Sequence, residues 1–476
     1  MDNFTMLADY YEFTMMNGYF EAGRENEIAI FDLFFREVPD GSGFAIMAGV
    51  EQLVDYLENL KFTDEDIDFF KKKGIFGEKF LSFLKNFHFT SDVWAVPEGT
   101  PIFPHEPILT VRGPVVEVQL IETMALLTIN HQSLIASKAN RIVRAAEGRP
   151  VMEFGSRRAQ GTHAANLGAR AAFIGGVVGS ANTMVDRDYG VPAMGTMAHS
   201  WVQLFPSEYE AFKAYCETYP DQATLLIDTY DTLDEGLPNA IRAFREVLIP
   251  KGFRPKGVRI DSGDLSYLTK KVRKVLDREG FSDCSIVVSG GLDEYVIRDL
   301  LVQGAKIDSF GVGERLITSK TEPVFGGVYK LSGIDNDGVI EPKIKISENT
   351  EKITVPGYKK VLRFFDKNTG DAMADLCMMR DEENPDGSAV EIFHPIHTWK
   401  KTTLENYEVK ELLVPIYKGG KLVYALPSLM DIRKKCEDEV GHLWDEVKRF
   451  ENPHRYYVDL SPKLWEVRNR LLSEHK

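Results

Sequence analysis

The sequence has few cysteines, no long hydrophobic run and no excess of positive charge. Its four cysteines lie far apart and form no CxxC pair, which argues against both a cysteine-based zinc site and a disulfide framework. The longest apolar stretch, residues 171–185, contains polar residues and is too short to span a bilayer. The first residues lack the basic segment and apolar core of a signal peptide. We therefore expect a cytoplasmic protein that does not enter a membrane.

The charge balance narrows the class of partner. With 57 Lys and Arg against 72 Asp and Glu, the formal net charge is -15, so no surplus of cations is available to neutralise nucleic-acid phosphates. A small anion held in a local basic pocket is compatible with this charge. Hydrophobic residues make up 43% and charged residues 27%, a balance typical of soluble globular proteins.

A chain of 476 residues is too long for one core, and we expect three parts. Residues 1–130 are predicted to contain helices, short strands cut by prolines, and a hairpin-like turn near residue 40. Residues 131–325 are predicted to form an α/β barrel. Residues 326–476 are predicted to be β-rich and then helical, and to build an additional α+β domain together with the N-terminal segment.

Short apolar runs separated by glycine and polar turns predict the barrel strands. The runs are residues 151–154, 171–178, 224–227, 257–260, 285–288 and 307–310. The later runs follow one another at intervals of about one strand plus one helix, which indicates a βα repeat. Because such strands present their carboxyl ends on one rim of a barrel, we expect the chemistry there.

Two consecutive strand ends carry glycines. Gly290 and Gly291 follow one strand, and Gly311 and Gly313 follow the next. Exposed backbone N–H groups in such turns can all point at one anion, so these four glycines are predicted to bind phosphate.

The preceding strand ends in the segment GVRIDSGD at 257–264, which presents Arg259 and Asp261. Asp261 could accept hydrogen bonds from sugar hydroxyls or help to hold a metal ion, or it could simply bond its own backbone in the turn. Arg157 follows an earlier strand with Arg158 beside it. Adjacent arginines repel each other unless an anion lies between them, or one is solvated and the other pairs with a carboxylate.

Two further residues have common structural roles as well as functional ones. His199 lies in GTMAHS at 195–200, and a single histidine is more often structural than catalytic. Tyr11 is predicted to lie on the apolar face of a first helix, with Phe4, Leu7 and Met15, where a tyrosine is more often part of the core than a ligand contact.

Taken together, these segments resemble the nicotinate phosphoribosyltransferase family. Five motifs occur in that family's order and spacing, namely EFGSRRAQG at 153–161, GTMAHSW at 195–201, RIDSGDL at 259–265, SGGLDE at 289–294 and GVGERLITS at 311–319. The opening ADYYEFTM at 8–15 is similar to the family's TDLYQLTM-like start, although it departs from it at several positions, and Tyr11 falls on the family's tyrosine.

The resemblance implies transfer of a phosphoribosyl group from phosphoribosyl pyrophosphate to nicotinate, with Mg²⁺ as cofactor and ATP as co-substrate. It implies phosphorylation of a histidine that maps onto His199. It also implies an irregular β/α barrel of the type II phosphoribosyltransferase kind, with an additional mostly β domain, in a homodimer with shared active sites. Tyr11 of the neighbouring subunit and Phe154 would sandwich the pyridine ring.

This chemistry suits the residues. The pyridine nitrogen has a free lone pair, so no general base is needed, whereas the leaving pyrophosphate needs arginines, magnesium and backbone amides. Arg157 and Arg259 would hold anionic groups and Asp261 the ribose hydroxyls. An aromatic sandwich suits a ring that becomes cationic.

One loop favours nicotinate over nicotinamide as the substrate. Relatives that use nicotinamide carry an aspartate there, whereas this chain has Ser180 and Asn182, which can donate hydrogen bonds to a carboxylate. Quinolinate phosphoribosyltransferase is a second reading, although that family is usually much shorter. A barrel aldolase or isomerase would need a Schiff-base lysine or a glutamate base at a strand end, and neither occurs at the strand ends identified here. A non-catalytic barrel that binds a nucleotide is a further hypothesis, and it would release no pyrophosphate.

Overall fold

The computed structural model describes residues 3–349 and 352–474. The chain folds as two compact units, one formed by Met1–Leu134 with Val324–Lys476 and the other by Ile135–Pro323. The first unit therefore combines both ends of the chain, and the second uses its middle.

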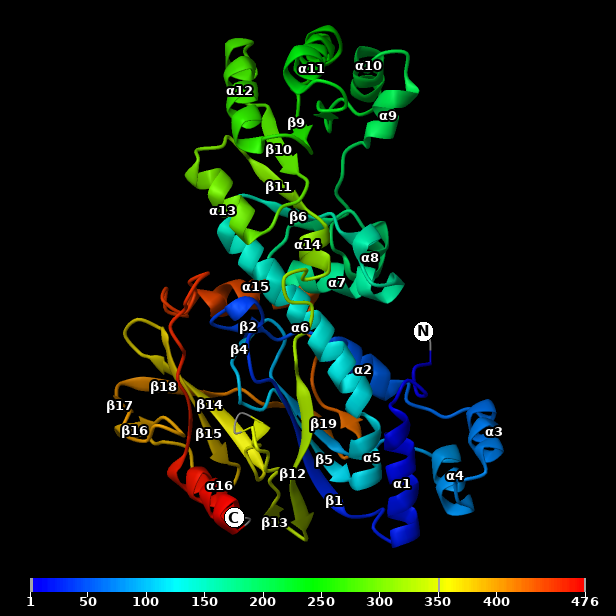
Figure 1. Ribbon diagram of the computed structural model, residues 1–476, viewed down its shortest axis with the longest axis vertical. Helices are drawn as coiled ribbons and strands as arrows, with labels where there is room; N and C mark the ends of the chain where they lie inside the picture. Colours follow the sequence, from blue (N-terminus) through cyan, green and yellow to red (C-terminus); the bar gives the residue numbers. More distant parts are fainter. Residues whose placement is uncertain (1–2, 350–351, 475–476) are drawn as a thin grey trace. The chain divides into compact units, whose positions relative to one another are not determined.

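The middle unit contains a sheet of six parallel strands in the order β7-β6-β11-β10-β9-β8. Figure 1 shows β9, β10, β11 and β6 side by side, with helices between successive strands. The strands are β6 (Val151–Glu153), β7 (Gly179–Ser180), β8 (Thr224–Leu226), β9 (Gly257–Ile260), β10 (Ser285–Ser289) and β11 (Ser309–Val312). Their apolar residues are almost all buried, as expected for a parallel sheet covered on both faces.

Helices connect these strands. They are α7 (Thr162–Ile174), α8 (Thr183–Tyr189), α9 (His199–Leu204), α10 (Glu208–Thr218), α11 (Leu237–Ala243), α12 (Leu265–Arg278), α13 (Glu294–Val302) and α14 (Glu314–Ile317). Residues 135–145 of α6 (Glu122–Ala145) also belong to this unit. The run 171–178 is not a strand, because its first half is the end of α7. The stretch THAANLGARAAFI is rich in alanine, the strongest helix former, and this outweighs its hydrophobicity.

The first unit contains a seven-stranded sheet in the order β13-β12-β1-β5-β3-β19-β20 and a four-stranded sheet in the order β18-β14-β15-β21. The strands are β1 (Ile28–Phe34), β3 (Asp92–Ala95), β5 (Leu109–Pro114), β12 (Val328–Asn336), β13 (Val339–Pro342), β14 (Lys359–Asp366), β15 (Ala372–Met379), β18 (Tyr407–Glu411), β19 (Val414–Lys418), β20 (Lys421–Leu422) and β21 (Val458–Leu460). The β-rich region predicted after residue 325 is present.

Two small strand pairs complete the first unit. β16 (Val390–Phe393) pairs with β17 (Lys401–Leu404), and β2 (Ala45–Ile46) pairs with β4 (Pro101–Ile102). The predicted hairpin around residue 40 does not form, because β1 pairs with β5 and β12 instead of β2. The turn at 39–41 is a short 3-10 segment that redirects the chain.

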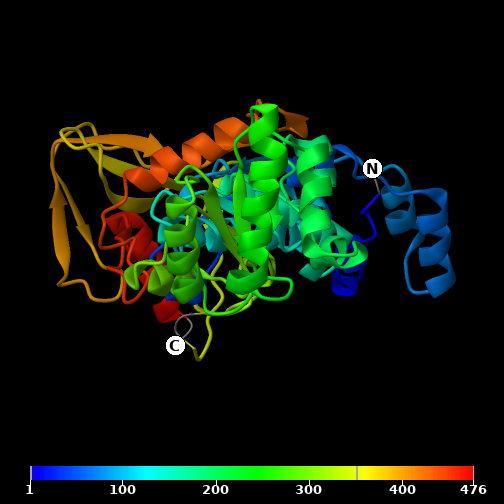
Figure 2. The same cartoon turned by 90° about the horizontal axis from the view of Figure 1, so that it is seen from above.

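The helices of the first unit are α1 (Tyr10–Ala22), α2 (Val50–Glu58), α3 (Asp64–Lys73), α4 (Glu78–Lys85), α5 (Val115–Leu120), α15 (Leu429–Gly441) and α16 (Pro462–Glu474). The end-on view in Figure 2 shows α3 and α4 side by side in blue. No helix in the described part of the chain is long and apolar enough to cross a membrane.

The buried face of α1 differs from the predicted one. Glu12, Phe13 and Met16 are buried, whereas Tyr11 and Met15 are 43% and 39% exposed. The apolar residues of this helix outnumber those that one face can bury, and a hydrogen bond from Thr123 allows Glu12 to take an inward position. Hydrophobicity alone therefore indicated the wrong face.

Candidate active site

The candidate residues of the barrel lie at one edge of its sheet. Because the six strands are parallel, their carboxyl ends meet there, and the segments that follow β6, β8, β9, β10 and β11 carry the residues singled out above. The predicted rim is present, and the side chains that follow β8, β9 and β10 are joined by hydrogen bonds.

Arg259, Asp261 and Ser289 form the centre of this network. The Arg259 Nε donates to Ser289 Oγ at 2.9 Å and its Nη2 donates to Asp261 Oδ1 at 3.0 Å. The Ser289 hydroxyl donates to the same Asp261 oxygen. Residues from β9 and β10 thus hold a guanidinium and a carboxylate in fixed orientation.

Asp261 does not bond its own backbone. Its amide N–H instead donates to Asp228 Oδ2 at 2.8 Å, and Ser262 Oγ donates to the same oxygen at 2.7 Å. Burial raises the pKa of the Asp261 carboxyl, but hydrogen bonds from Ser289 and Arg259 and the charge of Arg259 outweigh burial, so that its pKa lies below the ordinary value. Asp261 is therefore ionised and faces the rim as an acceptor.

Arg259 also fixes the loop that leads to His199. Its Nη1 donates to Thr196 Oγ1 at 3.1 Å and to the Met197 carbonyl oxygen at 3.3 Å. His199 begins α9, and its Nδ1 lies 3.1 Å from Thr229 Oγ1. Thr229, which follows β8, and Arg259 of β9 thus position the histidine and the loop that leads to it.

The Phe154 ring lies against Gly311 of β11 and close to Arg259. The Arg259 Cζ is 5.6 Å from the ring centroid, a cation–π geometry. A Cβ on Gly311 would lie 2.5 Å from the ring, so Gly311 makes room for Phe154. Gly311 is itself buried, and the structure therefore supports a packing role for this glycine more than direct contact with a phosphate.

The other glycines are open to a ligand to different degrees. Gly290 and Gly291 are exposed and adopt φ of 93° and 63°, values that favour glycine. A Cβ on Gly290 would lie 2.1 Å from the Asp261 carbonyl oxygen, whereas one on Gly291 would meet nothing within 4 Å. Gly313 is half-buried at the start of α14.

The two adjacent arginines have separate surroundings. Arg158 Nε lies 3.9 Å from Glu314 Oε2, a loose and exposed ion pair. Arg157 is exposed and forms no hydrogen bond or ion pair with any residue that the structure describes. Its guanidinium is therefore available for an anion from solution.

Ser180 and Asn182 already have partners. The Ser180 side chain is fully buried, and its hydroxyl donates to Glu153 Oε2 at 2.6 Å. Asn182 caps α8 through its Oδ1, which accepts from the Met184 N–H at 3.0 Å. The hydroxyl proton of Ser180 is thus committed within the protein, and the predicted donation from Ser180 to a nicotinate carboxylate does not match this geometry.

The comparisons with known proteins agree with these motifs. A profile described as the nicotinate phosphoribosyltransferase (NAPRTase) family matches residues 150–383, and profiles of the N-terminal and C-terminal domains match residues 6–130 and 358–468. Nicotinate phosphoribosyltransferase of Bacillus subtilis is 42% identical over the whole chain and 96% of its own length. The chain belongs to the nicotinate phosphoribosyltransferase family.

The family extends to human proteins. The human nicotinate phosphoribosyltransferase is 30% identical over 98% of this chain and 96% of its own length. The crystal structure of human nicotinic acid phosphoribosyltransferase superposes with a TM-score of 0.87 at 29% identity, over 97% of this chain and 99% of that one. The predicted fold class, an irregular α/β barrel with an additional domain, is confirmed.

In this member of the nicotinate phosphoribosyltransferase family, Tyr11 lies in the other structural unit. Burial raises the pKa of the Tyr11 hydroxyl, and so does Glu122, with which it forms a hydrogen bond. The ring remains 43% exposed within one chain. An exposed, anchored tyrosine is suited to contact a second molecule.

Sequence reasoning missed four residues of the nicotinate phosphoribosyltransferase rim, namely Glu153, Asp228, Thr229 and Ser289. Each lies at the end of a strand or within three residues after it, and this position is the signal that could have found them. Glu153 is fully buried, and it accepts hydrogen bonds from Ser180 and from the Gly155 N–H. Burial raises the pKa of Glu153, and these bonds only partly oppose that shift.

Proposed function

We propose that the chain transfers the phosphoribosyl group of phosphoribosyl pyrophosphate to nicotinate, coupled to ATP hydrolysis through a phosphohistidine. The products are nicotinate mononucleotide and pyrophosphate. Membership of the family makes the enzyme a phosphoribosyltransferase of NAD biosynthesis. The observation that carries the proposal is the network of Arg259, Asp261 and Ser289, which holds a cation and a carboxylate beside an aromatic ring.

Asp261 is proposed to bind the ribose. Its Oδ1 is occupied by Arg259 and Ser289, while its Oδ2 forms no hydrogen bond with the described residues and can accept from ribose hydroxyls. Positive charge develops on the ribose as its bond to pyrophosphate breaks. An ionised carboxylate held in advance stabilises that charge without reorganising.

Phe154 is proposed to carry the pyridine ring on its exposed side. The Arg259 guanidinium has five N–H donors, and it forms four hydrogen bonds to protein acceptors. Its remaining donor can pair with the carboxylate of nicotinate. This gives the enzyme a basis for preferring the acid over the amide that does not depend on Ser180, whose role becomes the positioning of Glu153.

The leaving pyrophosphate and the 5′-phosphate need separate groups. Gly290 and Gly291 expose backbone N–H groups at the end of β10 and are proposed to bind the 5′-phosphate. Arg157, free of protein partners in the described chain, is proposed to bind the pyrophosphate.

Magnesium fits the carboxylates at this edge of the sheet. Asp228 Oδ1 is buried and has no hydrogen-bond partner in the described chain, although the other oxygen of this carboxylate has two. The described chain contains no cluster of three or more side chains that could hold a metal ion. Mg²⁺ is usually bound by one or two carboxylates together with phosphate oxygens and water. Asp228, together with phosphate oxygens and water, would hold the ion, which when bound neutralises charge on the pyrophosphate.

His199 is proposed to accept the phosphoryl group from ATP. In the tautomer in which Nδ1–H donates to Thr229 Oγ1, the lone pair lies on Nε2. That nitrogen can attack the γ-phosphate of ATP, with ADP as the leaving group. Thr229 would therefore select the nucleophilic nitrogen.

The oligomer is proposed to be a homodimer in which Tyr11 of one chain completes the site of the other. The exposure of its ring supports this role. The cytoplasm is the proposed location, and four buried, unpaired thiols support a reducing environment.

The test is an assay of pyrophosphate release from phosphoribosyl pyrophosphate with nicotinate or nicotinamide, with and without ATP. We expect turnover with nicotinate and stimulation by ATP. In His199→Ala, ATP hydrolysis should disappear while slow transfer persists. Equal ATP hydrolysis in this variant and the parent enzyme would refute the phosphohistidine, and absence of pyrophosphate release would favour a nucleotide-binding protein.

A further inference from the structure

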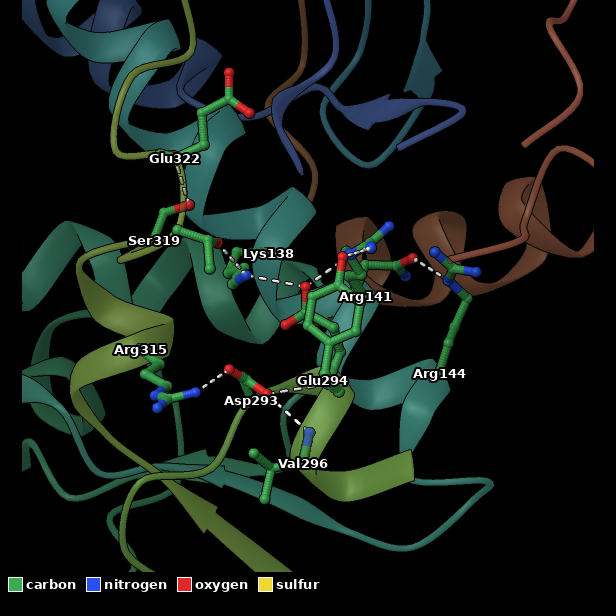
Figure 3. A network of polar contacts seen from close by, with 12 residues as sticks. Lys138, Arg141, Arg144, Asp293, Glu294, Val296, Arg315, Ser319 and Glu322 are labelled. Carbon is green, nitrogen blue, oxygen red and sulfur yellow. Dashed lines mark hydrogen bonds and ion pairs between the residues drawn. The ribbon is translucent and has the colours of Figure 1, made fainter. Parts of the chain in front are cut away.

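A group of charged residues follows the two glycine turns in the sequence, and Figure 3 shows how their side chains lie. Asp293 and Glu294 follow the turn at Gly290 and Gly291, and Arg315 follows the turn that ends at Gly313. None of these charged residues belongs to the network of Arg259 and Asp261.

Asp293 joins the two turns through its two carboxylate oxygens. Its Oδ1 accepts from the backbone N–H groups of Tyr295 and Val296 at 3.1 and 2.9 Å, and so caps α13. Its Oδ2 forms an ion pair with Arg315 Nη1. The Asp293 side chain is 4% exposed and that of Arg315 is 39% exposed.

Glu294 fixes this arrangement to α6. Its Oε1 accepts from Lys138 Nζ at 3.0 Å and from Arg141 Nε at 2.7 Å, and all three side chains are at most 2% exposed. Lys138 Nζ also donates to Thr321 Oγ1 at 2.9 Å, just beyond α14. A buried helix therefore binds both the start of α13 and the segment after α14.

We propose that Asp293 and Arg315 are positioning residues that set the separation of the two glycine turns, and that they thereby determine affinity for the phosphoribosyl pyrophosphate. The inference rests on the proposed function. The backbone donors of Gly290 and Gly291, and that of the half-buried Gly313 at the end of the second turn, can bind one phosphorylated sugar only if their spacing is fixed, because small displacements weaken every hydrogen bond to it. The ion pair links the segments that follow the two turns, in addition to the pairing of β10 with β11 at Ser289 and Gly311.

Two variants test the link without removing a phosphate ligand. Asp293→Asn keeps an oxygen that can cap α13 but loses the charge that pairs with Arg315. Arg315→Met removes the guanidinium and keeps much of the side-chain length. Arg278→Met is the matched control, since it makes the same charge change in an exposed pair at the far end of α12.

The measurements are KM for each substrate, kcat, thermal unfolding, and calorimetric binding of phosphoribosyl pyrophosphate alone. We expect KM and Kd for phosphoribosyl pyrophosphate to rise about tenfold in Asp293→Asn and in Arg315→Met, with KM for nicotinate and kcat within about twofold of the parent. The double variant should be no weaker than either single variant, because both remove one interaction. Arg278→Met should match the parent enzyme.

Three results would overturn the inference. If only Arg315→Met weakened binding, Arg315 would contact the ligand directly. If neither variant changed Kd, the ion pair would have no positioning role. If all kinetic constants worsened together with a lower melting temperature, the role would be merely structural. A parent enzyme that bound phosphoribosyl pyrophosphate without using nicotinate would refute the proposed function, while the calorimetric comparison would still decide on the ion pair.

Discussion

At the scale of single residues, Gly290 and Gly291 are adjacent but differently constrained. Both have positive φ, a conformation that costs a residue with a side chain about 1 kcal/mol. Only Gly290 also packs against backbone, because its Cβ would lie 2.1 Å from the Asp261 carbonyl oxygen. A side chain at Gly291 would therefore introduce backbone strain alone, whereas one at Gly290 would add steric overlap with the Asp261 backbone.

We expect Gly290→Ala to destabilise the enzyme by at least about 3 kcal/mol, because the Asp261 turn must move, and Gly291→Ala by about 1 kcal/mol. Gly290→Ala should also lose most activity, since Asp261 moves with its carbonyl. Calorimetric melting temperatures and KM for phosphoribosyl pyrophosphate check both effects. Equal melting temperatures for the two variants would show that the overlap is relieved at no cost.

Residue types at strand ends could be predicted from sequence because they are local features. Arg259, Asp261 and the glycine pair follow apolar runs directly, and all lie on the rim. Asp228 and Ser289 could not be given a partner, because each lies about thirty residues from the Asp261 turn and reaches it only through pairing of parallel strands. Likewise, only the structure shows that the Ser180 hydroxyl is already bound to Glu153.

At the scale of elements, α1 and the start of α6 are joined through a buried carboxyl group. Thr123 Oγ1 donates to Glu12 Oε1 at 2.5 Å, and the other oxygen of Glu12 is buried without a partner in the described chain. Burial raises the pKa of Glu12 to about 7, and the negative charge of Glu122 adds a smaller increase. The hydrogen bonds from Thr123 act in the opposite direction but do not cancel the effect of burial. The helix pair is therefore sensitive to pH near neutrality.

This shift predicts a pH-dependent stability. Between the ordinary pKa of 4.5 and about 7, the folded protein keeps a proton that the unfolded chain has released, so stability falls as pH rises through this window. The loss amounts to about 3 kcal/mol by pH 8. The glutamine of Glu12→Gln cannot ionise. As pH rises from 5 to 8, the melting temperature of this variant should therefore increase relative to that of the parent enzyme.

Glu21→Gln is the control for this prediction, since Glu21 is exposed on the same helix. The difference in melting temperature between Glu12→Gln and Glu21→Gln should widen over the same pH range. A constant difference between the two variants would mean that Glu12 is ionised in the folded protein at pH 5.

Helices and strands were predicted correctly where the spacing of apolar residues was clear. The predictions were wrong where two sequence features favoured different structures. The strands β8 to β11 follow short apolar runs between turns, and the β-rich region after residue 325 contains β12 to β20. Alanine-rich α7 looked like a strand because its end is uniformly apolar. The inward face of α1 depends on Thr123, more than a hundred residues away, and no local pattern contains that information.

At the scale of the whole molecule, the proposed site draws on two parts of the sequence that fold as separate units. Phe154, Asp261 and His199 belong to the middle unit, and Tyr11 belongs to the unit formed by the chain ends. If the site is shared between subunits, two inactive variants should restore activity when they are mixed. A site formed within one chain would not give this result.

Tyr11→Ala and Asp261→Ala should each be nearly inactive alone. If Tyr11 serves the neighbouring chain, random mixing of the two gives heterodimers with one intact site, and about a quarter of the parent activity returns. Mixing Asp261→Ala with Ser289→Ala should restore nothing, because both changes fall on the same side of the site. Recovery is measured as pyrophosphate release after the mixed subunits are dissociated and reassembled. If the first mixture also stayed inactive while heterodimers were present, Tyr11 would act within its own chain, and its exposed ring would need another explanation.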